Sequence, residues 1–244
     1  MLYALILFCV LGTAILSGIL GMAGGMILMA VLASTLSVAS AMMLHGAVQL
    51  TSNGSRAWFL REHVSWQIYP AYALGAALAL GLFSALMFVP DAGLVLILVG
   101  GFPILARFTR RLHGLDITRP LTTVTCGFLV TSAQLMAGVS GPLLDVFYLN
   151  SRLNRHAVVA NKALTQCFGH ALKLVYYGLI IGAVEDIPAW FYVLAMATAV
   201  LGARIGTRLL DHLQEDSFRR WSGAIILAIA VICVLRGVYQ LAGF

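Results

Sequence analysis

Residues 138–142, Gly138-Val139-Ser140-Gly141-Pro142, interrupt an apolar stretch that extends from about residue 119 to residue 150. A second glycine-rich break, Gly21-Met22-Ala23-Gly24-Gly25, interrupts the apolar stretch at about residues 2–36. Both stretches are longer than the roughly 20 apolar residues that one helical crossing of a bilayer needs. Broken apolar helices at corresponding places in two halves of a chain are typical of secondary transporters built from structural repeats.

The rest of the composition is that of an integral membrane protein. Hydrophobic residues make up 61% of the 244 residues and charged residues only 10%, whereas soluble domains carry about 25% charged residues. Further apolar runs follow one another at about 40–60, 67–88, 92–112, 157–181, 188–210 and 218–242. The connections between them are short, so we predict one all-α, polytopic unit in a lipid bilayer with no soluble domain.

The net charge of +6 does not indicate a nucleic-acid partner. The basic residues gather at the ends of apolar runs, where they orient helices by remaining on the cytoplasmic side. The cysteines lie inside apolar runs without metal or disulfide spacing, at positions Cys9, Cys126, Cys167 and Cys233. We therefore expect inert thiols and no metal site or cofactor.

The two halves of the chain align when one is shifted by 117 positions (138 − 21), which also places Gly24 on Gly141. The alignment continues without a gap through two stripes of polar residues, spaced so that each stripe occupies one helical face. The aligned pairs are His45 with Lys162, Gln49 with Gln166, Asn53 with His170, and Arg56 with Lys173. We predict two repeats, residues 1–116 and 117–244, each a glycine-broken hairpin (about 2–36 and 119–150) followed by three transmembrane helices.

The distribution of charge indicates that the repeats are inverted. Arginine and lysine concentrate in the segments 56–63, 107–119, 152–162 and 204–220, whereas the connections at Asp91 and at Glu185-Asp186 are acidic. Placing every basic segment in the cytoplasm requires each broken stretch to be a hairpin, either re-entrant or fully crossing. Both termini then lie outside. A plain eight-helix bundle without hairpins is the alternative.

Each break is a candidate anion site made of backbone. Ser140 is expected as an N-cap and Pro142 in the first turn of the helix after the second break. The N–H groups and the positive dipole end of such a helix start attract anions, and two inverted hairpins would bring two of them together near the midplane. The alternative is that the glycines only permit close helix packing. The backbone candidates are Gly21, Ala23, Gly24, Gly25, Gly138, Ser140 and Gly141.

The polar stripes supply candidate side chains for the same site. Gln49 and Gln166 lie near the centres of their helices and are predicted to donate to the anion, with Asn53 and His170 one turn further along. Lys173 is placed to neutralise the anion's charge. Interhelical hydrogen bonding remains the alternative for the glutamines, and a satisfied structural role is the alternative for His170.

Candidates for coupling or gating are His45, Arg56, Asn161 and Lys162. Arg56 has a second interpretation as an interfacial charge that extends toward water. Aromatic residues expected at the membrane interface are Tyr176, Tyr177, Trp58, Trp66, Trp190 and Trp221.

Together these features resemble the TauE/SafE sulfite exporter family of bacterial membrane proteins. The resemblance covers essentially the whole chain and rests on the breaks at Gly21 to Gly25 and Gly138 to Pro142, together with the four-plus-four layout. The first break departs from the family's form because it continues with Met26 and lacks a following proline. The resemblance implies a secondary transporter in the bacterial inner membrane, an exporter of sulfite, sulfoacetate or another organosulfonate, that works by alternating access. Protons are a candidate coupling ion, and a homodimer is a candidate assembly.

Two other functions fit parts of the sequence. Ser140 within Gly138-Val139-Ser140-Gly141, followed by His170, resembles the serine–histidine pair of rhomboid intramembrane proteases. The aligned first half keeps the glycines but has Ala23 and Asn53 at those two positions, so the repeat explains the motif without a nucleophile. An anion channel would need a continuous polar path, whereas the polar residues cluster at the breaks and stripes. Transport is favoured over both.

Overall fold

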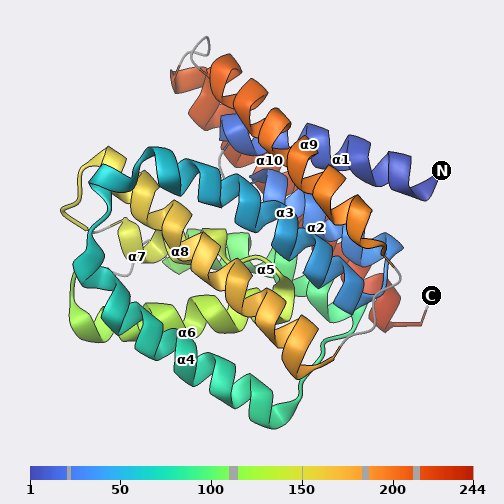
Figure 1. The fold of residues 1–244 in the computed structure, drawn as a ribbon, viewed down its shortest axis with the longest axis horizontal. Coiled ribbons are helices and arrows are strands. Elements are labelled where there is room, and N and C mark those ends of the chain that lie inside the picture. Colours follow the sequence, from blue (N-terminus) through green and yellow to red (C-terminus); the bar gives the residue numbers. More distant parts are fainter. Residues whose placement is uncertain (21–22, 110–114, 150, 183–186, 211–214, 244) are drawn as a thin grey trace.

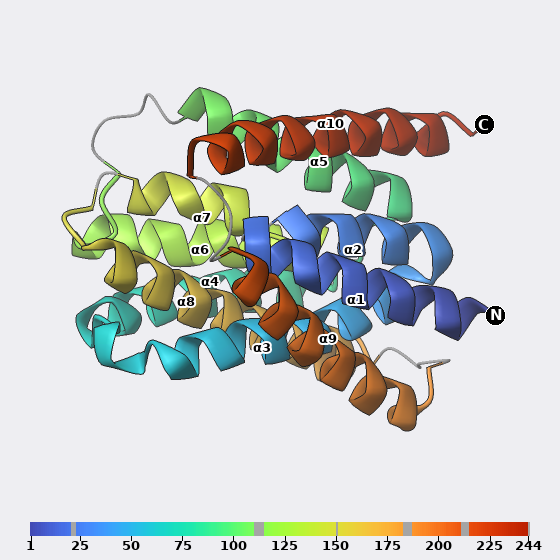
Figure 2. The ribbon, with the colours of Figure 1, turned by 90° about the horizontal axis from the view of Figure 1, so that it is seen from above.

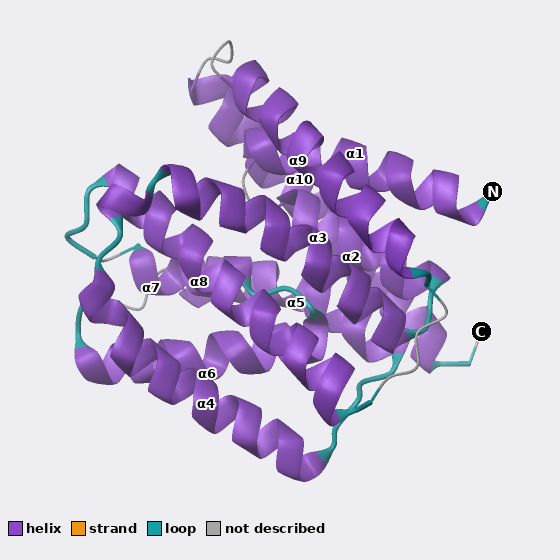
Figure 3. Ribbon diagram, viewed as in Figure 1, coloured by secondary structure: helices purple, strands orange, loops and turns teal. Residues whose placement is uncertain are grey.

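The computed structural model describes residues 1–20, 23–109, 115–149, 151–182, 187–210 and 215–243. Every regular element among these residues is helical, which confirms the predicted all-α class (Figure 3). The α-helices, shown in Figure 1, are α1 (Leu2–Leu20), α2 (Ala23–Thr35), α3 (Val38–Phe59), α4 (Tyr69–Leu86), α5 (Ala92–Thr109), α6 (Pro120–Ala137), α7 (Gly141–Tyr148), α8 (Arg155–Val175), α9 (Ala189–Leu210) and α10 (Glu215–Leu241). Short 3-10 turns at Arg61–His63 and Trp66–Ile68 precede α4, and a π-helical turn at Tyr176–Ile180 continues α8.

Each glycine-broken stretch consists of two helices that pack on each other, α1 with α2 and α6 with α7. The second arms are short: α2 has 13 residues and α7 has 8. At 1.5 Å per residue these arms are about 20 and 12 Å long, less than the roughly 30 Å of the hydrocarbon core. Each hairpin therefore pairs a long helix with one that is too short to span the hydrocarbon core. In a plain eight-helix bundle every helix would span it.

The helices that carry the polar stripes begin at equivalent residues. The hydroxyl of Ser37 accepts a hydrogen bond from the N–H of Ser40 (3.3 Å), and Asn154 Oδ1 accepts one from the N–H of Ala157 (2.9 Å). The two caps are 117 positions apart (154 − 37), as are the two donors (157 − 40). Capping side chains satisfy N–H groups that the helix leaves free. The internal alignment of the sequence thus extends to the starts of α3 and α8.

The two hairpins open toward opposite ends of the molecule. Both termini lie at one end, while the turns from α3 to α4 and from α7 to α8 lie at the other (Figure 2). The first hairpin opens toward the end with the termini, the second opens toward the opposite end, and their tips approach each other in the middle (Figure 2). Helices α3 and α8 run antiparallel beside the tips.

Glycines allow very close contact in the pairs α1–α9 and α4–α6. A Cβ on Gly206 would lie 2.2 Å from the carbonyl oxygen of Ile15, and one on Gly75 would lie 1.9 Å from that of Val124. Small residues at helix crossings let backbones approach in this way in membranes. Because the shift of 117 takes α1 onto α6 and α4 onto α9, these two interfaces are equivalent in the alignment. The pairs α3–α8 and α5–α10 each join a helix to its own counterpart.

Buried polar side chains concentrate near the hairpins. Among the described residues they belong to α1, α3, α6, α8 and the residue before α7. The outer helices expose leucine and valine instead, for example Leu78 and Leu82 in α4 and Val231 in α10. Helices long and apolar enough to cross a membrane, by length and composition, are found at Trp66–Leu86, Ala189–Gly206 and Ala224–Leu241. Shorter apolar helices are found at Leu2–Gly18, Ala23–Thr35 and Ala92–Phe108.

The prediction that Tyr176 and Tyr177 lie at the membrane interface was wrong, since both are fully buried. The hydroxyl of Tyr176 donates to the carbonyl of Phe88 (2.7 Å), and that of Tyr177 donates to the carbonyl of Leu135 (2.8 Å). Leu135 is in the last turn of α6, where carbonyls lack a partner within the helix. A nearby backbone acceptor therefore allows each phenol to be buried. Of the four tryptophans, Trp58, Trp66 and Trp190 are exposed, and the side chain of Trp221 lies outside the described residues.

Candidate functional site

A cavity of about 40 Å³ lies between the two hairpin tips and helices α3 and α8. Since one water needs roughly 10–15 Å³ on this measure, it has room for a few waters or one small oxyanion. The predicted residues that the structure brings to its lining are Gly25, His45, Gln49, Asn53, Arg56, Ser140, Gly141, Gln166 and His170. Lining residues that were not among the predicted binding or gating residues are Ser17, Met26, Ser52, Val139 and Pro142.

The first turns of α2 and α7 both face this cavity. Gly25 belongs to the first turn of α2, and Ser140 and Gly141 stand at the start of α7. In α7 the helical ladder begins with the bond from the N–H of Leu144 to the carbonyl of Ser140 (2.9 Å). The N–H groups ahead of Leu144 have no acceptor within the helix, and the dipole places partial positive charge at such ends. Two helix starts of this kind favour a negatively charged occupant.

The described side chains that line the cavity include a positive charge and no carboxylate. Arg56 is half-buried and lines the cavity, and its guanidinium makes no hydrogen bond or ion pair with another described residue. Carboxylates whose side chains the structure describes, none of which lines the cavity, are Glu62, Asp91, Asp116 and Asp145. A guanidinium without a carboxylate partner can donate hydrogen bonds to two oxygens of an anion at once.

The two glutamines present amide donors. The Nε2 atom of Gln166 is buried and has no hydrogen-bond partner among the described residues. The amide of Gln49 lies against Gly25, where a Cβ would come within 2.3 Å of its Nε2 atom. Any other residue at position 25 would displace this amide. Asn53 donates from Nδ2 to the backbone carbonyl of Gln49 (3.0 Å).

Gln134 organises the wall contributed by the second hairpin. Its Nε2 atom donates to the carbonyl of Gly138 (2.9 Å) and to Nδ1 of His170 (2.8 Å), and its Oε1 atom accepts from the hydroxyl of Ser140 (2.7 Å). Because an amide nitrogen can only donate, Nδ1 of His170 is the acceptor, and the neutral ring carries its hydrogen on Nε2. That N–H has no partner among the described residues, and His170 lines the cavity.

The role predicted for the Ser140 side chain is corrected by these contacts. Ser140 occupies the N-cap position of α7, but its hydroxyl makes no capping bond and donates to Gln134 instead. Pro142 stands in the first turn, as expected, and has no N–H to be capped. Gln134 also occupies Nδ1 of His170, so a glutamine joins the serine to the histidine where a protease needs direct contact.

Lys173 lies behind the cavity wall. Its side chain is fully buried, with Nζ 2.9 Å from Nδ1 of His45 and 3.1 Å from the carbonyl oxygen of Gly138. The Nε2 atom of His45 is 2.9 Å from the carbonyl oxygen of Gly25. A carbonyl only accepts, so Nε2 carries the hydrogen and Nδ1 accepts from Lys173. This hydrogen-bonded chain joins the first turn of α2 to the tip of the second hairpin.

Of the remaining backbone candidates, Ala23, Gly24 and Gly138 do not line the cavity. A Cβ on Gly24 would lie 1.9 Å from the carbonyl oxygen of Thr13, so this glycine permits close packing of α2 on α1. Gly138 ends α6 at a φ of 71°, a left-handed conformation that favours glycine. Ala23 is buried at the start of α2. Gly21 lies outside the described residues, as do Glu185 and Asp186.

Two coupling or gating candidates have partners away from the cavity. Asn161 is buried, donates to the carbonyl of Ala157 (2.7 Å) and accepts from the N–H of Ser65 (3.0 Å), which ties α8 to the turns before α4. Lys162 forms an ion pair with Asp145 of α7, and both side chains are partly exposed.

Sequence reasoning missed Gln134, Ser17 and Ser52. All three are polar residues in apolar helices, and the shift of 117 places Ser17 on Gln134 (134 − 17) and Ser52 on Gly169 (169 − 52). Extending the alignment upstream of the breaks would have found the first pair. The alignment does not mark Ser52, since its counterpart is glycine, but its spacing of three residues from Gln49 and four from Arg56 places it on the same helical face.

Comparison with known proteins agrees with the resemblance. The family model described as "Sulfite exporter TauE/SafE" matches residues 5–232, nearly the whole chain. Searches of curated proteins and of solved structures found no match. Proteins of the matched family are transporters and not enzymes, and the apolar helices accord with a multi-pass membrane protein. The chain belongs to the TauE/SafE sulfite exporter family.

Proposed function

We propose that this protein is a secondary transporter that exports a small sulfur-containing anion, such as sulfite, sulfoacetate or another organosulfonate, across the bacterial inner membrane. One observation carries the proposal: the first turns of α2 and α7 meet Arg56 at a single cavity, and no described carboxylate lines it. Sulfite and sulfonate groups each have three oxygens that accept hydrogen bonds. The amides of Gln49 and Gln166 and the N–H of His170 are donors of the kind that such oxygens need.

The proposed binding position is near the bilayer midplane, between two inverted repeats, residues 1–116 and 117–244. Three features support the inversion: the hairpins open toward opposite ends (Figure 2), the caps of α3 and α8 are 117 residues apart, and the pair α1–α9 corresponds to α6–α4. Inverted repeats provide two packings of similar energy, which alternating access requires.

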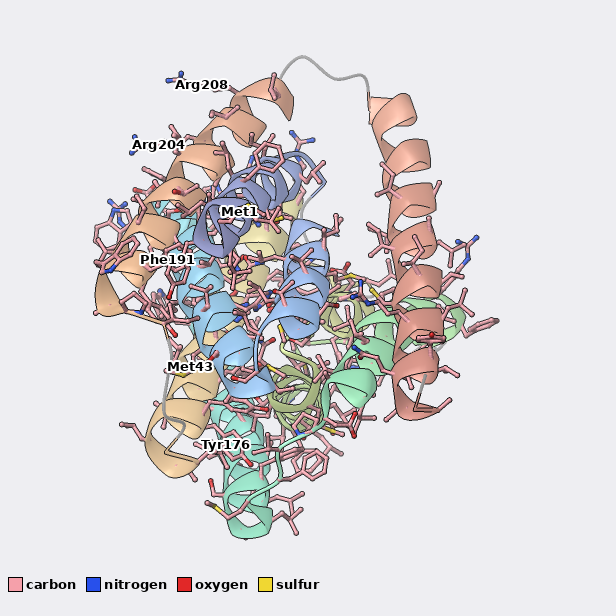
Figure 4. All side chains as sticks on the ribbon, turned by 90° about the vertical axis from the view of Figure 1, so that its right-hand side faces the viewer. Met1, Met43, Tyr176, Phe191, Arg204 and Arg208 are labelled. Atoms are coloured by element: carbon pink, nitrogen blue, oxygen red, sulfur yellow. The ribbon has the colours of Figure 1, made fainter. Side chains whose placement is uncertain are left out.

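The proposed topology places both termini outside, because the basic segments then share the cytoplasmic side. Arg204 and Arg208, toward the carboxyl end of α9, point away from the bundle in Figure 4.

Thr35 and Arg152 are both exposed and 117 residues apart (152 − 35). Single cysteines at these positions, in a chain without its native cysteines, should react with an impermeant maleimide from opposite sides. Reaction of both from the same side would exclude the inversion.

The function is tested with purified protein in liposomes, using sulfite, sulfoacetate, taurine, thiosulfate and sulfate. We expect saturable flux of at least one sulfite or sulfonate, accelerated by the same anion on the opposite side, as exchange through a closed site requires. Arg56→Gln should lose this flux, while Arg61→Gln, at a position exposed on the turn after α3, should keep it. Flux that does not saturate would indicate a channel. Absence of binding for all five anions would overturn the proposal.

Protons are the coupling ion that we propose. A homodimer remains a prediction; the exposed apolar faces of α4, α9 and α10 provide surface for a second copy or for lipid.

A further inference from the structure

Lys173 is a fully buried lysine in a helix of a membrane protein, and its neighbours do not include a described carboxylate. Burying an isolated ammonium in a medium of low polarity is very costly. The two acceptors around Nζ, His45 Nδ1 and the carbonyl of Gly138, match the two N–H groups of a neutral amine. An ammonium has a third N–H, for which the described residues supply no acceptor. The hydrogen-bond geometry around Nζ therefore fits the neutral amine.

His45 connects this amine to the cavity. Its ring lines the cavity, stands 5.4 Å from the ring of His170 between centroids, and accepts from Lys173 through Nδ1. An additional proton on the pair can therefore lie on Nζ of Lys173 or on Nδ1 of His45. In the second position the positive charge is on a ring of the cavity wall.

None of the described titratable or charged groups around the Lys173–His45 pair carries a negative charge. Helix α3 contributes His45 itself and Arg56, and α8 contributes His170 one turn before Lys173. The π-helical turn contributes the phenols of Tyr176 and Tyr177, both of which donate to backbone carbonyls. The group that faces the pair from α6 is the neutral amide of Gln134. Among the described parts of the chain, nothing balances an added proton, so an anion in the cavity would be its counter-charge.

We propose that the Lys173–His45 pair binds one proton when an anion enters the cavity and releases that proton when the anion leaves. The amine and the imidazole hold one proton more in the occupied state, and its charge balances one negative charge of the anion. Anion and proton would then cross the membrane together and in the same direction. This inference rests on the proposed function, because it assigns the coupling ion of the same site.

The test is calorimetric titration of the detergent-solubilised protein with sulfoacetate, whose two acid groups stay ionised around neutral pH. Repeating the titration in buffers with different ionisation enthalpies counts the protons taken up per anion bound. We expect about one proton at about pH 7.5, and an affinity that falls about tenfold for each unit of rising pH where the pair changes its proton. The sign follows from uptake: fewer free protons disfavour the occupied state.

The double variant Lys173→Met/His45→Asn should bind sulfoacetate more weakly, without proton uptake and without that pH slope. Arg152→Gln, which removes an exposed cation from the loop before α8, should keep both. Wild-type binding without proton uptake overturns the inference and leaves the proposed function standing, even if the double variant fails to fold. Undiminished uptake in a folded double variant also overturns it and points to His170. Failure of all the tested sulfur anions to bind removes the proposed function first.

Discussion

The two hairpin tips meet at one cavity but contribute to it in different ways. At the first tip, Ser17 of α1 and Gly25 of α2 are small and line the open space. At the second tip Gln134, the counterpart of Ser17, occupies the equivalent place and is hydrogen-bonded to Gly138, Ser140 and His170. The cavity is thus asymmetric, in part because Ser17 and Gln134, which are aligned, differ in size.

The residue that packs against Gln134 compensates for its larger side chain. Gly169 lies against Gln134, and a Cβ there would come within 3.4 Å of the Gln134 Cγ atom. Its counterpart in the first half, Ser52, lines the cavity beside Ser17. The large residue in α6 is therefore paired with a glycine in α8, and the small residue in α1 with a serine in α3. The missing side chain of Gly169 thus leaves room for the larger side chain of Gln134.

Disrupting the first tip should have the largest effect. In Gly24→Ala, the new Cβ would lie 1.9 Å from a backbone oxygen of α1, which cannot move away alone. We expect a loss of stability of at least about 3 kcal/mol, at the upper end of overpacking effects, and little folded protein. Gly12→Ala is the matched control, because a Cβ on this α1 glycine meets nothing within 4 Å. Thermal unfolding of the two variants measures the difference, and equal stabilities would mean that the tips are not tightly packed.

The second largest effect is expected from a substitution that makes the first tip resemble the second. Ser17→Gln fills a cavity of only about 40 Å³, and we expect sulfoacetate affinity to fall by about a hundredfold or more, equivalent to about 3 kcal/mol. Thr35→Gln, with the same side chain at the open end of the first hairpin, should bind normally. The reciprocal Gln134→Ser should lower stability by about 2–3 kcal/mol, since it leaves buried groups without partners. Normal binding by Ser17→Gln would show that the cavity does not hold the anion.

The aligned glutamines should show a smaller and more equal effect. Leucine in place of Gln49 or Gln166 removes one donor to a charged group, worth about 1.5–3 kcal/mol, so affinity should fall about tenfold to a hundredfold. Equilibrium binding to each variant is the measurement, with helicity as the check on folding. If affinity stays within about twofold in both variants, the glutamines serve packing and the anion binds elsewhere.

The smallest effect is expected at Lys162, the counterpart of His45. His45 lines the cavity, whereas Lys162 pairs with Asp145 at a partly exposed position. Partly exposed ion pairs contribute about 0–1 kcal/mol, so Lys162→Met should change stability little and anion affinity not at all. A loss of flux without a loss of binding would instead give Lys162 the gating role that its place in the alignment suggested.

The sequence predicts the hairpins and the shared face of the polar stripes because glycine breaks and helical spacing are local properties. The sequence does not predict which of these side chains reach the cavity, since that depends on where α3 and α8 cross. Arg56 and Lys173 are aligned, yet Arg56 lines the cavity while Lys173 turns behind its wall to His45. Burial of Tyr177 likewise depends on a carbonyl at the end of α6, a partner that composition does not reveal.

Leu50 and Cys167 are also 117 positions apart (167 − 50), and they touch: the cysteine Sγ is 3.8 Å from the leucine carbonyl oxygen. Under the proposed repeat, this point lies on the axis that relates the halves. An ancestor made of two identical copies, inserted in opposite orientations, would have faced the same side chain across that axis. Only after duplication and fusion could each copy mutate alone, so leucine opposite cysteine is a contact that a single gene for one half could not have encoded.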